Sequence, residues 1–334
     1  MADKYNNKII GLLVLCGALL LVYILTFVFD PEKSAARGAA WTALDPKSKE
    51  DVRQIELDGE EQIILVKNNG LWFVSFEDAL YPARQNKALE LLDTLTARGI
   101  YAVRSKSEAA QEKLMLTETE ARRIIVKDEA GITLLNLLIG APDATMKEVY
   151  IRLADSKEIR SGEDVFSRFT SKRQNWYDLR LFPDQDKDAL NVSSVQRVIV
   201  QMPPPEIFDE SENVDIFTGS YTLSRENGGW ILQDSGKMAN TQTVETYIRR
   251  ILDCEAAGFT SAMGANDPEF MDPSFPAGKL ILELGNGSRK TITVGPKIDE
   301  KYSVAVSGSK YVYLLPSILI LNNIFIDQET LTGE

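Results

Sequence analysis

The sequence of 334 residues contains no histidine. This absence excludes the Ser-His-Asp and Cys-His nucleophile systems, most zinc sites and the usual pH switch near neutrality. Only two cysteines are present, Cys16 in an apolar N-terminal run and Cys254 in a helix predicted far along the chain. A disulfide between them is not expected, because a folded domain would have to reach into the bilayer to form it.

Basic residues are fewer than acidic ones, with 37 Lys and Arg against 49 Asp and Glu, a formal net charge of -12. This excess of negative charge repels the phosphates of nucleic acids, and no basic stripe offsets it. We therefore expect no nucleic-acid partner. The hydrophobic content of 44% is typical of a folded globular protein, and the length is sufficient for two domains with a core each.

Catalytic motifs are missing as well. There is no G-x-S-x-G nucleophile elbow and no dinucleotide fingerprint after a strand. The acidic run at 184–188 resembles the start of a calcium loop, but Ala189 and Val195 occupy the places of its glycine and its glutamate. We therefore predict that the protein is not an enzyme and has no cofactor and no metal site. An envelope hydrolase that uses two carboxylates stays an alternative, because so many acidic residues have acidic neighbours.

The N-terminal region has a long hydrophobic run instead. Positions 9–29 read IIGLLVLCGALLLVYILTFVF, which is 21 residues without a charge. At a rise of 1.5 Å per residue such a helix spans about 30 Å, the thickness of the hydrocarbon core of a bilayer. We predict a transmembrane anchor over 9–29.

The charges beside this run indicate its orientation. Lys4 and Lys8 precede it, which favours a cytoplasmic tail over 1–8 and an extracytoplasmic C-terminal region. The predicted location is the bacterial inner (cytoplasmic) membrane, with a single pass. A cleaved signal peptide is the main alternative, because small residues follow at 34–36 and 38–40.

Beyond a small, polar spacer predicted over 30–48, the same order of elements occurs twice. We predict three strands in each copy, at 52–57, 62–67 and 71–76 and again at 195–201, 221–225 and 230–233. An Asn-Gly turn precedes the third strand in both copies, at Asn69-Gly70 and Asn227-Gly228. Trp72 and Trp230 fall at corresponding places after these turns.

An amphipathic helix follows in each copy. Its apolar stripe consists of Ala88, Leu91, Leu92 and Leu95 in the first copy and Val244, Tyr247, Ile248, Ile251 and Leu252 in the second. We expect these helices to end near Gly99 and Gly258, since glycine favours a C-terminal cap. A small antiparallel sheet and a short helix are predicted to close each copy.

The predicted fold is therefore α+β: an N-terminal transmembrane helix, then two similar modules of antiparallel sheet with amphipathic helices. The modules cover 49–170 and 193–330, and a connector covers 171–192. The copies differ in two connections of the second, at 202–220 and 264–278, which we interpret as solvated loops or, alternatively, as contacts with a partner.

Four aromatic residues are candidates for interaction or for packing between the modules. They are Trp72, Trp176, Tyr177 and Trp230. Aromatic side chains of this kind are more often part of a core than of a ligand platform. Trp176 is the first candidate among them, because it falls at the joint between the two copies.

Several segments, taken together, resemble a known family. They are the anchor, the W-x(n)-Y-P-A segment that ends at 81–83 before a helix, SKSE at 105–108, LLIGAPD at 137–143, VYIRL at 149–153 and RQNWYDLRLF at 173–182. They are similar to the bacterial domain-of-unknown-function 4340 family over most of 50–190 and more weakly over the second copy. Members are often found alongside ABC transporters of the gliding-motility auxiliary type. The resemblance therefore implies an extracytoplasmic accessory subunit with ABC-transporter subunits as partners, and it implies no catalytic residues.

We accordingly expect a non-catalytic, membrane-anchored accessory or scaffold protein in an envelope complex of the ABC-transporter type. The main alternative is a solute- or polymer-binding protein that holds its ligand in the groove between the two modules.

Overall fold

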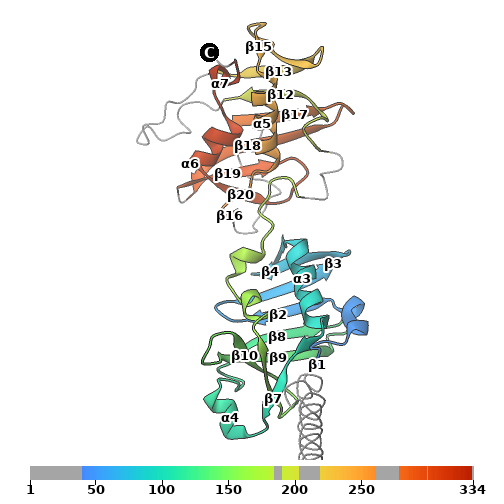
Figure 1. Ribbon diagram of the computed structural model, residues 1–334. Coiled ribbons are helices and arrows are strands. Elements are labelled where there is room, and N and C mark those ends of the chain that lie inside the picture. Colours follow the sequence, from blue (N-terminus) through green and yellow to red (C-terminus); the bar gives the residue numbers. More distant parts are fainter. Residues whose placement is uncertain (1–39, 184–189, 203–218, 261–277, 299, 333–334) are drawn as a thin grey trace, which may run out of the picture. The chain divides into compact units, whose positions relative to one another are not determined.

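The computed structural model describes residues 40–183, 190–202, 219–260, 278–298 and 300–332 (Figure 1). The predicted cytoplasmic tail and transmembrane run lie outside the described residues, as do the acidic run at 184–188 and most of the two long loops of the second copy. Within the described part of the chain, no helix is long and apolar enough to cross a membrane.

The chain divides into two compact units. The first holds the described residues up to Phe76 together with Ala83–Trp176, and the second holds Glu77–Pro82 and the described residues from Tyr177 onward. The change from Trp176 to Tyr177 falls inside the connector predicted at 171–192.

The core of the fold is a pair of nine-stranded sheets whose strands follow the same order. The order in the first sheet is β5 (Ala79–Pro82), β4 (Leu71–Phe76), β3 (Gln62–Asn68), β2 (Gln54–Asp58), β8 (Arg122–Lys127), β9 (Thr133–Pro142), β10 (Glu148–Leu153), β11 (Ile159–Glu163) and β7 (Ala102–Ser105). The order in the second is β15 (Met238–Ala239), β14 (Gly229–Leu232), β13 (Tyr221–Glu226), β12 (Val195–Gln201), β17 (Gly278–Leu284), β18 (Arg289–Ile298), β19 (Lys301–Val306), β20 (Val312–Pro316) and β16 (Gly258–Phe259). Two similar sheet modules are therefore confirmed.

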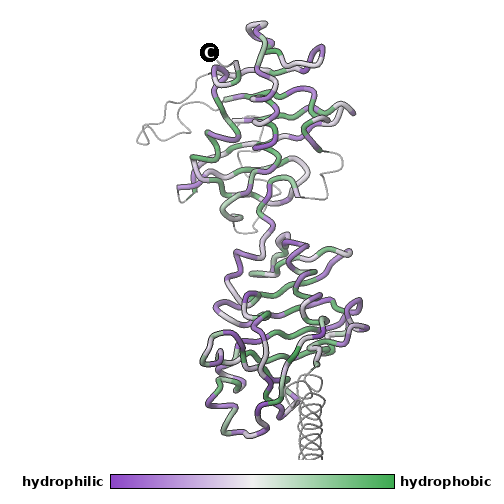
Figure 2. Tube along the Cα trace, in the orientation of Figure 1, coloured by the Kyte–Doolittle hydropathy of each residue, from purple (hydrophilic) through white to green (hydrophobic). Residues whose placement is uncertain are grey.

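The hairpins that open each module form for a local reason. Asn69 and Gly70 have φ values of 49° and 84°, and Asn227 and Gly228 have φ values of 49° and 82°. Two successive residues with positive φ make the tight turn whose twist matches that of the strands, and Asn-Gly adopts it at low cost. Hydrophobic residues follow the strands in both units, whereas the turns are mostly hydrophilic (Figure 2).

The two long helices, α3 (Gln85–Thr96) and α5 (Thr241–Leu252), are each 12 residues long and lie across one face of their sheet (Figure 1). Their buried residues stand at equal positions, with Ala88, Leu91, Leu92 and Leu95 in α3 and Val244, Tyr247, Ile248 and Ile251 in α5. Leu252, which the pattern also placed on the stripe, is only partly buried. The amphipathic pattern thus predicted both helices and their buried faces.

The expected C-terminal caps of these helices were wrong. The caps are Ala97 and Asp253, whereas Gly99 and Gly258 lie in the short strands β6 (Gly99–Ile100) and β16. Neither glycine has a positive φ, so the chain does not use the left-handed conformation for which glycine is favoured at a cap. Cys254, predicted in the helix, follows its end and is buried.

The closing strands do not form a separate small sheet, as the sequence had suggested. Ile55 of β2 pairs with Val126 of β8, and Val198 of β12 pairs with Leu282 of β17, so the opening and closing strands join in one sheet. Without these pairings, β2 and β12 would each expose a row of unpaired backbone N–H and C=O groups.

The described end of the predicted spacer is folded onto the first unit. The strand β1 (Ala40–Trp41) pairs with β6, and the ring of Trp41 lies 5.3 Å from that of Tyr101. Leu44 is only 2% exposed, and its amide donates to Leu95 O at 2.9 Å. From Ala40 onward, this segment is therefore part of the domain.

The remaining helical elements are short. The first unit has α4 (Glu108–Lys113) and 3-10 turns at Pro46–Asp51, Ser167–Phe169 and Arg173–Trp176. The second ends in α6 (Ser317–Leu319), a π-helical turn at Ile320–Ile324 and α7 (Gln328–Thr332). This C-terminal segment packs beside α5 and forms the pocket described next.

Candidate functional site

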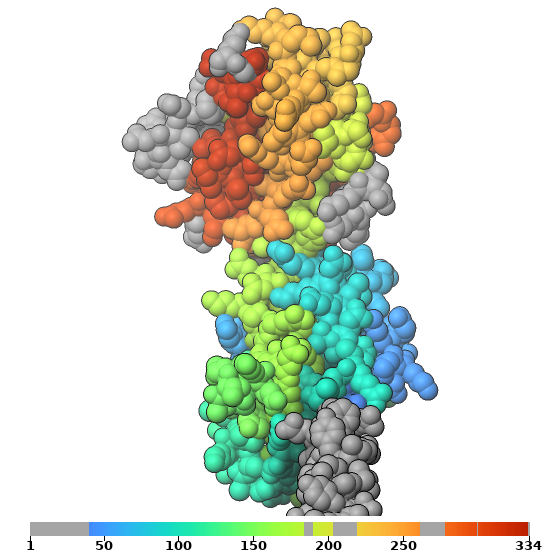
Figure 3. All heavy atoms as spheres, viewed as in Figure 1, coloured from blue at the N-terminus to red at the C-terminus, as the bar shows by residue number. Residues whose placement is uncertain are grey.

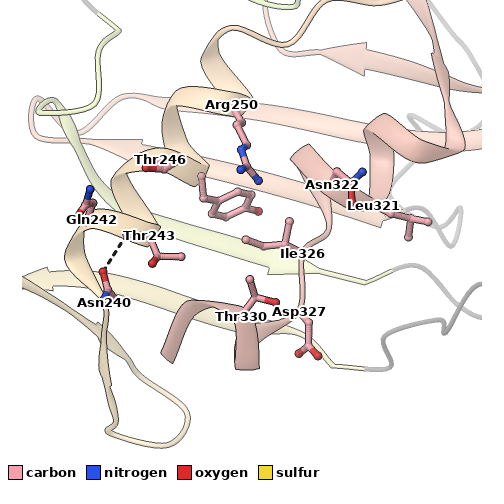
Figure 4. Close-up of a pocket in the computed structure, with 11 residues that line it drawn as sticks. Asn240, Gln242, Thr243, Thr246, Arg250, Leu321, Asn322, Ile326, Asp327 and Thr330 are labelled. Atoms are coloured by element: carbon pink, nitrogen blue, oxygen red, sulfur yellow. Dashed lines mark hydrogen bonds between the residues drawn. The ribbon is translucent and has the colours of Figure 1, made fainter. Parts of the chain in front are cut away.

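A pocket of about 500 Å³ lies in the second unit, between α5 and the C-terminal segment (Figure 4). One wall consists of residues of the first three turns of α5 and its N-cap Asn240, and the other consists of residues 321–330. The two segments lie against each other on the visible face of the unit, α5 in orange and the C-terminal segment in red (Figure 3). The pocket thus depends on how residues 321–330 pack against α5.

Two tyrosine hydroxyls form hydrogen bonds that hold the C-terminal segment in place. Tyr247, which lines the pocket and is 2% exposed, donates to Ile324 O at 2.7 Å. Tyr221 donates to Ile326 O at 3.0 Å. Both phenols are protonated donors at neutral pH, and burial raises the pKa of each above its ordinary value. They hold residues 324–326 against α5 through Tyr247 and against β13 through Tyr221.

The capping residues of two helices close one end of the pocket. The side chain of Asn240 accepts a hydrogen bond from Thr243 N at 3.1 Å (Figure 4). The backbone N–H of Asn240 donates to Leu331 O at 2.8 Å. Asp327 accepts from Glu329 N at 3.1 Å through Oδ1. These bonds satisfy backbone donors at the starts of α5 and α7, and they join the two helices at the pocket edge.

Arg250 supplies the positive charge in the lining. It is exposed, and its guanidinium points into the pocket toward Ile326, whereas the carboxylate of Asp327 points away from it (Figure 4). Among the described residues, Arg250 makes no hydrogen bond and no ion pair. Its donors are therefore available to a molecule in the pocket.

The rest of the lining is polar but uncharged. It contributes hydroxyls, amides and a few apolar atoms, from Gln242, Thr243, Thr246, Leu321, Asn322, Ile326 and Thr330. No thiol lies in this lining, and in the described part of the chain no group of three His, Cys, Asp or Glu side chains is arranged to hold a metal ion. The arrangement offers hydrogen bonds and one positive charge, which suits the binding of a polar molecule.

The structure places two of the predicted aromatic residues in corresponding cores. Trp72 is 1% exposed and Trp230 is fully buried. The side chain of the residue paired with each lies over its ring, Lys67 Nζ at 5.9 Å and Arg225 Cζ at 5.0 Å from the ring centre. Each tryptophan is therefore covered by a cation from the neighbouring strand.

The other two predicted aromatic residues lie at the change of unit. Trp176 is buried in the first unit, donates to Phe169 O at 3.3 Å and has Lys87 Nζ at 4.5 Å from its ring centre. Tyr177 lies in the second unit, edge-on to Phe259 at 5.6 Å. The role of the four residues in interaction or in packing between modules stays a prediction.

None of these four residues lines the pocket. Of the residues that do, the sequence pattern indicated only Tyr247, and it did so as part of the apolar stripe of α5. The signal that could have indicated the others is the difference between the two helices at corresponding positions. Thr243 and Thr246 stand in α5 where α3 has the longer side chains Lys87 and Glu90.

Comparisons with known proteins bear on the family alone. A search of curated proteins and of solved structures finds no match for this chain. A family model described as a domain of unknown function (DUF4340) matches residues 72–274, which is more than half of the chain. The matched range includes α3, α5 and the wall of the pocket that Asn240 and α5 form. The chain belongs to the DUF4340 family.

Proposed function

We propose that this protein is a non-catalytic accessory or scaffold subunit, anchored in the bacterial inner membrane through residues 9–29, with its two sheet modules outside the cytoplasm. The observation that carries the proposal is the uncharged run of 21 residues at 9–29. We propose an ABC transporter as the partner, because the family resemblance implies an association with such transporters.

The folded part suits a scaffold. Each of the two nine-stranded sheets has a long helix on one face, so binding surfaces on loops would rest on a rigid base. The absence of histidine and of a nucleophile motif in the sequence supports a role that does not involve catalysis.

Cysteine labelling tests the anchor and its orientation. Cys254 is 2% exposed and burial raises the pKa of its thiol, so it gives little background labelling. Ala130 lies in an exposed turn of the first unit. In cells with a permeabilised outer envelope and a sealed inner membrane, a membrane-impermeant maleimide is expected to label Ala130→Cys of the full-length chain.

The matched control is Asn6→Cys, which lies on the predicted cytoplasmic side and is expected to react only after lysis. Labelling of Asn6→Cys in sealed cells, or protection of Ala130→Cys there, contradicts the orientation. Recovery of the full-length chain in the soluble fraction contradicts the anchor itself.

The accessory role makes a separate prediction. In a mild detergent extract of native membranes, the full-length protein is expected to migrate in a native gel at a mass well above that of its own 37.3 kDa chain and detergent micelle. Migration as a lone monomer removes the main support for a role in a complex.

A further inference from the structure

The duplication provides an internal comparison for the pocket. α3 and α5 have equal length and equal buried positions, so their residues correspond one to one. Thr243, Thr246 and Arg250, which line the pocket, correspond to Lys87, Glu90 and Thr94. The same helix face can therefore be compared in two modules with the same strand order.

In the first module, charged side chains on this face make contacts within the unit. Lys87 lies over the ring of Trp176 and donates to Asn175 O at 3.2 Å, and burial lowers its pKa. Glu90 forms an ion pair with Arg168 at 2.9 Å. Residues 168–176, which follow the sheet of the first module, thus contact both Lys87 and Glu90.

In the second module the corresponding side chains are short. Thr243 and Thr246 do not reach the segment opposite, and the space of about 500 Å³ remains between α5 and residues 321–330. Leu321 and Asn322 in the facing wall belong to the π-helical turn, a rare element that is frequent at functional sites. The duplicated fold has thus been altered on both walls of this one face.

The same alteration introduces a charge. At the position of Thr94, whose hydroxyl in α3 donates to Glu90 O at 2.8 Å, α5 has Arg250 with no partner among the described residues. A guanidinium is the side chain that pairs best with a planar carboxylate, through two parallel hydrogen bonds.

We propose that the second module binds a small hydrophilic carboxylate in this pocket. Arg250 binds the carboxylate, and the amide of Asn322 and the hydroxyls of Thr243 and Thr246 bind the polar groups of the rest of the molecule. Asp327 on the rim and the net charge of -12 disfavour a dianion such as phosphate. This inference goes beyond the proposed function and does not depend on the anchor.

Saturation-transfer NMR on the detergent-solubilised full-length protein tests the proposal. Two probes carry a carboxylate, D-glucuronate as a sugar acid and N-acetyl-L-alanine as a peptide C-terminus. Each has a neutral twin, D-glucose and N-acetyl-L-alaninamide. At least one carboxylate is expected to bind, about tenfold or more tightly than its twin. The probe that binds identifies the source of the carboxylate.

Two neighbouring arginines provide the variant and its control. Arg250→Gln is expected to weaken the bound carboxylate about tenfold or more, whereas Arg249→Gln, exposed on the same helix turn but outside the lining, is expected to leave it unchanged. Equal effects of the two variants overturn the proposal. Binding of neither carboxylate, equal binding of the neutral twins, or displacement by an equal concentration of inorganic phosphate also overturns it.

Discussion

At the scale of single residues, the two modules repeat an unusual detail. Trp72 Nε1 and Trp230 Nε1 are buried and have no hydrogen-bond partner among the described residues, whereas Trp176 Nε1 donates to Phe169 O. Removing a buried N–H that has no partner breaks no hydrogen bond, whereas removing a paired N–H leaves its buried acceptor without a donor, which costs free energy.

This contrast predicts an order among three Trp→Phe substitutions. Trp176→Phe leaves Phe169 O without its donor and is expected to lower the free energy of unfolding by about 1 kcal/mol more than Trp72→Phe or Trp230→Phe. Urea unfolding followed by circular dichroism measures the three values. Equal losses in all three variants contradict the assigned hydrogen bonds.

The two tyrosines that fix the C-terminal segment predict a pH dependence. The pKa of Tyr247 is raised above the ordinary value of 10.0 by burial, so with rising pH the unfolded chain loses its proton before the folded one. The stability that this group contributes is full below about pH 10 and is lost as the pH rises above it.

Amide hydrogen exchange in the second unit between pH 9 and pH 11, on the order of one unit on either side of the ordinary tyrosine pKa, checks this expectation after correction for intrinsic rates. Protection of α5 is expected to fall, and Tyr247→Phe is expected to flatten the fall while lowering protection throughout. A wild-type protection that rises over this range contradicts the account.

At the scale of elements, the hairpin turns carry the clearest sequence signal. Gly70 and Gly228 have φ values of +84° and +82°, and a Cβ at either meets nothing within 4 Å. The cost of alanine there is backbone strain alone, about 1–2 kcal/mol at each. Gly70→Ala and Gly228→Ala are therefore expected to destabilise their own units by equal amounts.

The control for these turns is Gly219→Ala, where a Cβ is equally unhindered and φ is not positive. This change is expected to lower the unfolding free energy by less than about 0.5 kcal/mol. Thermal unfolding of the three variants gives the comparison. A loss at Gly219 as large as at the turns means that strain at positive φ is not the cause.

Local sequence patterns predicted the individual strands and helices well. They did not predict which distant strands pair with each other. Strands at Gln62–Asn68 and Leu71–Phe76 and the buried face of α3 follow from alternation, from an Asn-Gly turn and from helical spacing. The pairing of β2 with β8 joins residues about 70 positions apart, as Ile55 with Val126 shows, and no local pattern carries that information.

Burial by neighbouring elements is equally hard to see in a sequence. A strand with one solvent-facing side alternates buried and exposed residues, yet all residues of β19 from Tyr302 to Val306 are buried. The polar member of this run, Ser303, donates to Pro296 O at 2.8 Å, which satisfies a group that alternation would have placed in solvent. The pocket escaped prediction for a related reason, since its residues come from α5 and from a segment about 80 positions later.

At the scale of the whole molecule, duplication with divergence is the main finding. Both modules share one strand order and the same buried tryptophan beneath a cation. They differ on the outer face of the long helix, where Lys87 and Glu90 of the first module contact Trp176 and Arg168, whereas the second module has a polar pocket. We infer that the first module has kept a structural role and that the second has been altered for recognition.

The central claim is that this chain is an accessory subunit of a membrane complex. Affinity purification of the tagged full-length protein from gently solubilised native membranes, with mass spectrometry of its companions, tests that claim most directly. We predict recovery of an ATP-binding subunit together with its membrane permease, in amounts comparable to the tagged chain. Recovery of the tagged chain alone, under conditions that keep a known transporter complex intact, contradicts the account.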